Sequence, residues 1–241
     1  MKFEVIATGW NCREYVRKCV QSVFNQTYNN FHLHLISDGS TDGTCEMINR
    51  YRNNGRISVH IHAENKGAAL RRLQVIRPLD KDSICLLLGL DDELLPNCLE
   101  RIKQEYDKGK WMTYGNWHDQ HGQMLPHDFE LEFSEIEHQE ISYRQLKYRS
   151  TAPNTFKKFL FDHIPDEDFK VNGRWMDNAT ETELMFSCLE MCGKRRIGVI
   201  KEPIYIYNRG RKTGTIARHG MNHKMAILKE VMSRPKKPLL K

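Results

Sequence analysis

The sequence predicts an α/β fold with a parallel sheet covered by helices. Strand-like and helix-like segments alternate through the first half of the chain, which is the pattern of repeated strand–helix–strand units. The segment 84–89 is a continuous apolar run, as expected of a strand that is buried on both faces. The chain has 241 residues, of which 39% are hydrophobic, so it can bury the core of one such domain.

The expected elements follow one another in chain order. From Tyr15 the apolar residues recur at helical spacing, and polar and apolar residues alternate in the strand that comes next. Gly193 closes the last expected helix. The expected strands are 2–7, 31–37, 56–62, 83–89, 111–117 and 199–208, and the expected helices are 15–24, 40–52, 65–76, 95–109 and 180–193.

Charge is unevenly distributed along the chain. The net charge is +6, but residues 111–143 hold seven acids and no lysine or arginine. From Lys194 to the end there are fourteen lysines and arginines against two acids. A basic end suits phosphates, nucleic acid or an anionic membrane surface. The other interpretation is that the last residues, 233–241, are solvated and partly disordered.

Cysteine usage and hydropathy indicate where the protein works. The seven cysteines are scattered without a C-x-x-C pair, and Cys188 and Cys192 lie on one face of an expected helix as small core residues. No apolar stretch is long enough to cross a bilayer, and we see no secretory signal. A reducing, cytoplasmic location is the default expectation.

Three consecutive acids end the buried run in "LLLGLDDELLP". Adjacent carboxylates repel one another, so Asp91, Asp92 and Glu93 are either a solvated turn or the site of a cation. Ligands of parallel sheets bind at the carboxyl ends of the strands, where these acids lie. The segment "SDGSTDGT" places Asp38 at the end of another strand, before a glycine turn whose N–H groups suit an anion or a nucleobase edge. By itself that segment is also compatible with a simple turn and helix cap.

The order of these segments resembles family 2 glycosyltransferases, the inverting group with the GT-A nucleotide-sugar fold. The resemblance begins with Trp10-Asn11, "SVFNQTYNNF" and "DGSTDGT", at the family's spacing. It continues with "NKGAALRR", "LGLDDELLPN", "APNTFKKFLFDHI" and "TETELMFSCLEMCGKRRIGVIKEPIYIYNRG", and covers about 3–215. It implies a mixed, mostly parallel sheet flanked by helices, and a single domain. Its nucleotide-sugar half would be 1–117, its acceptor half 118–220, and its basic tail 221–241.

The resemblance also implies a divalent cation, Mn²⁺ or Mg²⁺, that bridges the donor diphosphate. Asp91 matches the metal-binding aspartate and Asp92 lies beside it. Hard oxygen ligands suit such ions, and phosphates and water complete the shell. In the family pattern an earlier aspartate stands where this chain has Gly89, a departure that affects the expected ribose contact and donor affinity more than the metal site.

Nucleotide contacts follow from the same resemblance. The loop after the first strand, Thr8, Gly9, Trp10 and Asn11, matches the segment that packs on the nucleotide. Asp38 matches the aspartate that recognises the base edge, and a UDP-sugar is the expected donor.

Charged contacts to the diphosphate are less fully determined by the sequence. Arg71 or Arg72 would reach the diphosphate, and the sequence leaves the choice open. Arg211 and Lys212 could meet the leaving diphosphate, and His219 could add a metal or diphosphate contact.

Inversion requires a base that takes the proton of the acceptor hydroxyl. The position of the family's catalytic aspartate is occupied by Glu181, preceded by Thr180. Asp177 is the second candidate, whereas Glu183 would point elsewhere on the helix. The acceptor would be a glycan, a lipid-linked sugar or another small molecule, with peripheral membrane contact through the basic end.

Three other functions remain open from the sequence. A nucleotidyltransferase would carry a glycine-rich first loop with lysine or arginine, which "ATGWNCREY" is not. A catalytically degenerate nucleotide-sugar-binding module would explain the departures at Gly89 and Thr180. Nucleic acid as acceptor, suggested by the basic tail alone, is not expected, and it would make affinity fall steeply with salt.

Overall fold

The computed structural model describes residues 1–124, 131–134, 142–209 and 215–240. The strands are β1 (Phe3–Gly9), β2 (Phe31–Asp38), β3 (Ile57–His62), β4 (Ile84–Gly89), β5 (Glu93–Leu94), β6 (Met112–Asp119), β7 (Asn154–Lys157), β8 (Lys170–Val171), β9 (Arg174–Trp175) and β10 (Ile197–Tyr207). The helices are α1 (Val16–Phe24), α2 (Thr44–Asn49), α3 (Ala68–Ile76), α4 (Cys98–Asp107), α6 (Lys158–Asp162), α7 (Thr180–Cys192) and α8 (Thr215–Ser233). Short 3₁₀ turns are η1 (Tyr143–Gln145), η2 (Asp166–Phe169) and η3 (Lys194–Arg196).

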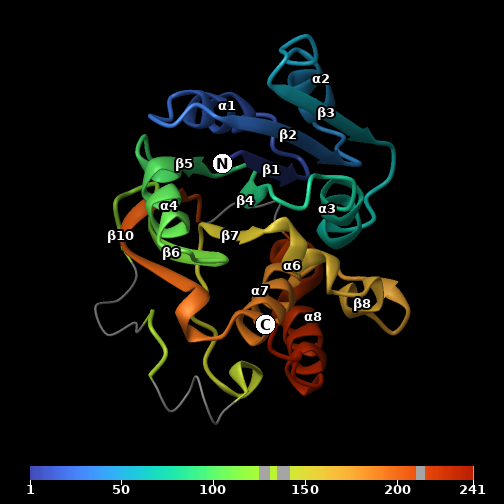
Figure 1. Cartoon of the computed structure of the whole chain (residues 1–241). Coiled ribbons are helices and arrows are strands. Elements are labelled where there is room, and N and C mark those ends of the chain that lie inside the picture. Colours follow the sequence, from blue (N-terminus) through green and yellow to red (C-terminus); the bar gives the residue numbers. More distant parts are fainter. Residues whose placement is uncertain (125–130, 135–141, 210–214, 241) are drawn as a thin grey trace.

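Eight strands form one mixed, mostly parallel sheet, in the order β3-β2-β1-β4-β7-β6-β10-β5 (Figure 1). β1 pairs in parallel with β2 and β4, β2 with β3, and β10 with β6. β7 runs antiparallel between β4 and β6, and β5 runs antiparallel to β10. The fold class expected from the sequence is therefore confirmed.

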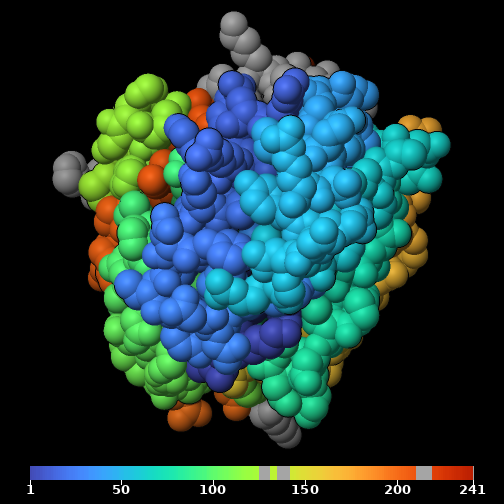
Figure 2. Space-filling model, turned by 90° about the horizontal axis from the view of Figure 1, so that it is seen from above, coloured from blue at the N-terminus to red at the C-terminus, as the bar shows by residue number. Residues whose placement is uncertain are grey.

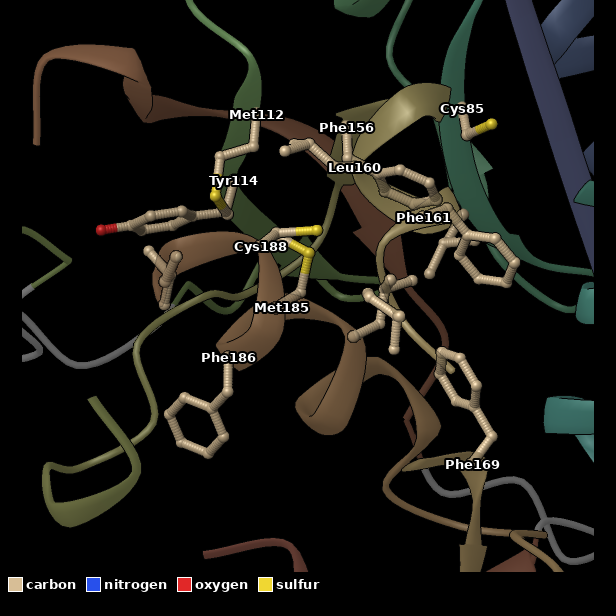
Figure 3. Packing of buried hydrophobic residues seen from close by; sticks show 14 of the residues in the cluster. Cys85, Met112, Tyr114, Phe156, Leu160, Phe161, Phe169, Met185, Phe186 and Cys188 are labelled. Carbon is tan, nitrogen blue, oxygen red and sulfur yellow. The ribbon is translucent and has the colours of Figure 1, made fainter. Parts of the chain in front are cut away.

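The pleat of β1 divides the core into two layers. Phe3, Val5 and Ala7 point to the face covered by α1 and α4, whereas Ile6 points to the opposite face. That opposite layer packs α3, α6, α7 and α8 against the sheet, and Figure 3 shows Met185 and Cys188 of α7 facing β6 and β7. Seen from above, the N-terminal segments form one continuous surface (Figure 2).

The expected elements agree with the observed ones to within a few residues, except in the second helix. The helix expected over 40–52 is shortened to α2, because residues 38–43 form a loop that is held by long-range bonds to the end of β1. Within the residues that the structure describes, no helix is long and apolar enough to cross a membrane.

Residues 234–240 form no helix or strand, and Pro235, Lys236, Pro238 and Leu239 are exposed as the sequence suggested, but other residues of this segment contact the rest of the domain. Arg234 donates to the Glu183 carboxylate at 3.0 Å and to a backbone carbonyl of β8 at 2.7 Å. The Lys237 amide donates to Glu190 at 3.0 Å, and the Leu240 amide to the Met191 carbonyl at 2.9 Å. The end of the chain is therefore fastened along α7, because buried acids of that helix need cationic or N–H partners.

A histidine cluster joins the edge strand β3 to its neighbour β2. His34 contacts His60 at 3.3 Å and the Glu4 carboxylate at 3.0 Å. Burial, together with the neighbouring His34 and His62, lowers the pKa of His60 from 6.5 to about 4. The native edge strand therefore holds a neutral imidazole that an unfolded chain would protonate.

We expect the protein to lose stability on acidification because of His60. Its native pKa lies below its unfolded value, so its stabilising contribution is present above pH 6.5 and is lost as pH falls toward 4. Between pH 7 and pH 5 the free energy of unfolding should fall by about 2 kcal/mol from this residue. Urea unfolding at both pH values measures it, with His60→Gln as the control variant. An equal loss in His60→Gln would contradict the assignment.

Candidate active site

Three loops meet where β1, β2 and β4 end, at the carboxyl edge of the parallel strands. The backbone joins two of them directly, because the Leu90 N–H donates to the Thr8 carbonyl at 3.1 Å. Gly9 is required at this junction: a Cβ there would lie 2.5 Å from Cys12 Sγ and 2.7 Å from Leu90 Cβ. The expected nucleotide-binding loop is thus held against the acidic turn.

The loop after β1 is fixed to the loop after β2. Trp10 Nε1 donates to the Gly39 carbonyl at 3.1 Å, and the Asn11 N–H donates to Ser40 Oγ at 3.0 Å. Asn11 Oδ1 in turn accepts from the Thr41 N–H at 2.9 Å. Asn11 has φ +53°, in the left-handed region that asparagine tolerates better than most residues. The Trp-Asn pair therefore shapes this rim of the site.

Asp38 organises the segment that leads into α3. Its two carboxylate oxygens accept from the Lys66 N–H at 3.0 Å and the Gly67 N–H at 2.8 Å. Arg71 Nε also donates to it at 2.7 Å, and Arg71 donates further to the Glu64 carbonyl at 2.6 Å. Both Asp38 and Arg71 are buried. Of the two arginines that the sequence left open, Arg71 is therefore the one committed to holding this loop.

The acidic turn packs over Gly89. Tyr205 of β10 donates to Asp92 Oδ2 at 2.6 Å, and the Asn208 N–H donates to Asp92 Oδ1 at 2.8 Å. The Tyr205 hydroxyl also accepts from the Gly89 N–H at 3.3 Å. A Cβ on Gly89 would lie 2.5 Å from Asp92 Oδ2 and 2.8 Å from Asp91 Oδ1. The Asp91 and Asp92 carboxylates therefore occupy the space that the side chain of an aspartate at position 89 would need.

The carboxylate oxygens of this turn are of the kind that binds a divalent cation. The two aspartates differ in burial. Asp92 is buried, and each of its oxygens already accepts a hydrogen bond. Asp91 is half-buried and lies at the mouth of the turn. Across the described ranges, no three His, Cys, Asp or Glu side chains come together as a complete metal site. Asp91 therefore fits an ion whose remaining ligands come from phosphate and water.

Arg72 connects the donor side to the expected base. Its guanidinium donates to Glu181 Oε1 at 2.5 Å, across 109 residues of sequence. The Arg72 side chain is 8% exposed and that of Glu181 is 40% exposed, so the carboxylate is reachable from solvent. Burial acts to raise the pKa of Glu181, but Arg72 and the charge of Lys224 outweigh it and hold that pKa below its usual value.

The pKa of Tyr207, near the end of β10, is raised by burial and by its acidic surroundings. Partial burial and the negative charges of Asp92, Asp91 and Glu181 raise the pKa of its phenol to about 12. Arg209 opposes them. The phenol of Tyr207 therefore stays protonated, and uncharged, at neutral pH.

Asp177, the second candidate base, is bound to α8. It accepts from His223 Nε2 at 2.8 Å, and its other oxygen lies 3.4 Å from His219 Nε2. The structure therefore places His219 next to a carboxylate. Arg211 and Lys212 lie outside the described residues.

Several buried polar atoms around this region lack a hydrogen-bond partner among the residues that the structure describes. They are Thr8 Oγ1, Arg72 Nε, Asn178 Nδ2 and Thr180 Oγ1. Thr8 lies at the end of β1, Arg72 lies on α3, and Asn178 and Thr180 lie just before and at the start of α7. Each of these three parts of the site therefore contains a buried polar atom without a hydrogen-bond partner among the described residues. Such groups cost free energy unless a ligand or water satisfies them, which is typical of a binding site.

Sequence reasoning missed Tyr205 and His223. Tyr205 lies in an alternating strand whose pattern shows that it is buried but not that it meets Asp92. His223 shares the Asp177 carboxylate with His219, but Gly220 interrupts the helix between the two histidines, so their spacing in the sequence did not predict a shared partner.

The fold and this edge define a GT-A glycosyltransferase. Residues 5–164 match the family model described as "Glycosyl transferase family 2", and the chain belongs to that family. It is 27% identical to glycosyltransferase GlyG of Streptococcus pneumoniae over 226 residues, covering 89% of this chain and 72% of GlyG. It is 34% identical to chondroitin synthase of Pasteurella multocida over 106 residues, covering 44% of this chain and 11% of the synthase.

Solved structures agree on the fold. The chain superposes on S. aureus TarS 1–349 in complex with UDP-GlcNAc with a TM-score of 0.69 at 16% identity, covering 96% of this chain and 65% of that one. It superposes on the mannosyltransferase PcManGT of Pyrobaculum calidifontis, in complex with GDP-Man and Mn²⁺, with a TM-score of 0.63 at 15% identity, covering 98% and 66%. The chain therefore spans about two thirds of the length of these neighbours.

Proposed function

We propose that this glycosyltransferase moves a sugar from a UDP-sugar to an acceptor hydroxyl with inversion. The observation that carries the proposal is the ion pair between Arg72 and the partly exposed Glu181, in a fold whose strand β4 leads into the acidic turn with Asp91. A partly exposed carboxylate and an oxygen donor for a cation are the two groups that inverting transfer needs. TarS, a neighbour of the same fold, was solved with UDP-GlcNAc.

In this mechanism the loops at the strand ends bind and orient the donor. Trp10, Asn11 and Asp38 form the nucleotide side, with Thr8 and Gly9 supporting it. Asp91 holds the divalent cation, and Asp92 keeps the turn in place through Tyr205. When bound, the cation stabilises the charge that develops on the leaving nucleotide diphosphate. PcManGT, another neighbour, was solved with Mn²⁺.

Arg72 has two roles in the proposal. It holds the Glu181 carboxylate in one orientation, and its buried Nε has no partner within the described part of the chain. An incoming diphosphate would draw on the same guanidinium, because arginine binds phosphate through several donors. Sharing Arg72 with the diphosphate would weaken its hold on Glu181 and raise the proton affinity of that carboxylate, which suits a base. Donor binding would thus prepare Glu181 to accept the acceptor's proton.

Calorimetric titration with UDP, GDP, CDP and dTDP, each with and without Mn²⁺, tests the donor site. We expect selective, Mn²⁺-dependent binding of UDP, and we expect Asp91→Ala to weaken it by at least about tenfold because an anionic ligand of the cation is lost. Glu93→Gln is the matched control, since it removes an adjacent acid of the same turn that is not assigned to the cation. Wild-type protein that bound no nucleotide under any condition would overturn the proposal in favour of a catalytically degenerate module.

A further inference from the structure

The exposed face of α8 carries an apolar stripe. Gly220, with φ +81° and ψ +166°, interrupts the helix, and a regular segment follows it. In that segment Met221, Met225 and Met232 are 54%, 55% and 43% exposed. Leu228 is half-buried, and with it the spacing i, i+4, i+7, i+11 places all four on one narrow line along the helix.

This stripe borders the face by which α8 packs on the domain, because Leu228 also packs against the core while the three methionines are exposed. Ile227 and Val231 supply the buried contacts and are 5% and 0% exposed. Lys224 and Lys229 lie on the two sides of the methionine line at helical spacing. Glu230 is the one acid in the sequence 219–240. The outer face of α8 is therefore amphipathic, with apolar side chains in the middle and cations at both margins.

We propose that this stripe, made of Met221, Met225, Leu228 and Met232, is the surface by which the enzyme docks on an anionic lipid membrane. Unbranched methionine side chains can enter the boundary between headgroups and acyl chains, while lysines at the margins reach the anionic headgroups. Figure 1 shows α8 at the periphery of the molecule, on the side away from α1 and α2.

Charge and area favour a membrane over a second protein. Two copies that met through this face would bring lysine-bearing margins together, with a single glutamate per helix segment to offset them. A line of three methionines and one leucine also offers far less than the roughly 800 Å² per partner of a standard protein interface. An anionic bilayer needs no such area from the protein, because apolar insertion and lysine attraction add together.

Docking through α8 would bring the membrane close to the chemistry. The same helix contacts Asp177 through His223, and the charge of Lys224 acts on Glu181. Provided the proposed transferase function is correct, the acceptor is then a hydroxyl compound carried at the membrane surface, such as a lipid-linked glycan. The docking surface itself does not depend on that function.

Vesicle flotation with the full chain tests the docking. We expect binding to phosphatidylcholine vesicles that contain about 30 mol% phosphatidylglycerol, little binding to pure phosphatidylcholine, and release as salt rises from about 50 to about 500 mM. The triple variant Met221→Ser, Met225→Ser, Met232→Ser should lower the affinity by at least about tenfold, and Lys229→Glu should do so at low salt. Met124→Ser and Lys18→Glu, at exposed positions outside α8, are the matched controls and should bind as the wild type does.

Two further measurements separate the possible failures. UDP binding without vesicles and the thermal unfolding midpoint should be unchanged in the triple variant, so that a folding defect or loss of the donor site is recognised. Equal flotation of wild type and triple variant, or no flotation of the wild type at low salt, would overturn the docking proposal. So would a wild-type dimer in light scattering that the triple variant converts to a monomer, because the stripe would then join two copies.

Discussion

Replacing Glu181 by glutamine is expected to lower the turnover rate by about 10²- to 10⁴-fold, because no carboxylate then accepts the acceptor's proton. The substitution keeps the size of the side chain and a hydrogen-bond acceptor for Arg72, so UDP affinity should stay within a factor of about three. Release of the nucleotide from UDP-sugar, with water as the acceptor, measures the rate without knowledge of the natural acceptor. Asp177→Asn is the matched control and should retain most of the rate. A larger loss in Asp177→Asn than in Glu181→Gln would make Asp177 the base.

The pH dependence of the rate is an independent test of Glu181 as the base. Glu181 acts as a base only when it is deprotonated, and its native pKa is held below the usual value. The acidic limb of the kcat/KM profile, which reports the donor-free enzyme, should therefore lie below the pH expected of an ordinary glutamate. Arg72→Met removes the main opposing cation and leaves burial to raise the pKa, so activity should be lost at a higher pH. An acidic limb that stayed in place would separate Arg72 from Glu181.

Replacing Arg144 by methionine is expected to destabilise the protein by about 3–5 kcal/mol, because two buried carboxylates lose their main cation. Arg144 is 1% exposed and pairs with Glu183 at 2.9 Å and Glu190 at 3.1 Å. It also donates to the Val231 carbonyl at 2.8 Å, so it ties α7 to α8. Urea unfolding followed by circular dichroism measures the change.

Two variants control this measurement. Arg101→Met removes a surface ion pair with Glu202 and should cost less than about 1 kcal/mol. Combining Arg144→Met with Glu183→Gln and Glu190→Gln should recover part of the loss, because the stranded charges are gone. A loss below 1 kcal/mol in Arg144→Met alone would show that water or other cations compensate the two acids, contrary to the buried cluster described above.

The candidate site could be predicted from sequence where it depends on position along a strand. Asp38 and Asp91 follow buried strands that pair in parallel with β1, so both had to emerge at one edge of the sheet. Glu181 begins a helix whose apolar pattern is strong, which placed it near the start of α7. The role of each side chain was harder to predict, because its partners come from segments far away in the chain.

Arg72 and Asp92 show that limit most clearly. Helical spacing could not decide between Arg71 and Arg72; in the folded chain the first meets Asp38 at the end of β2 and the second meets Glu181 at the start of α7. Asp92 was expected beside the metal-binding aspartate, and only the folded chain shows that Tyr205 of β10 donates to its carboxylate. Likewise, the sequence did not show that Arg234 and the Lys237 amide of the partly solvated tail meet buried acids of α7.

The sequence by itself determined the alternation of strands and helices, the edge at which the site lies and the family to which the chain belongs, because each is written in local periodicity and ordered motifs. The tertiary structure alone decided which arginine pairs with Glu181, which partners the Asp92 carboxylate meets and which face of α8 remains exposed. These depend on strand register and helix packing, where a shift of one residue turns a side chain toward a different partner.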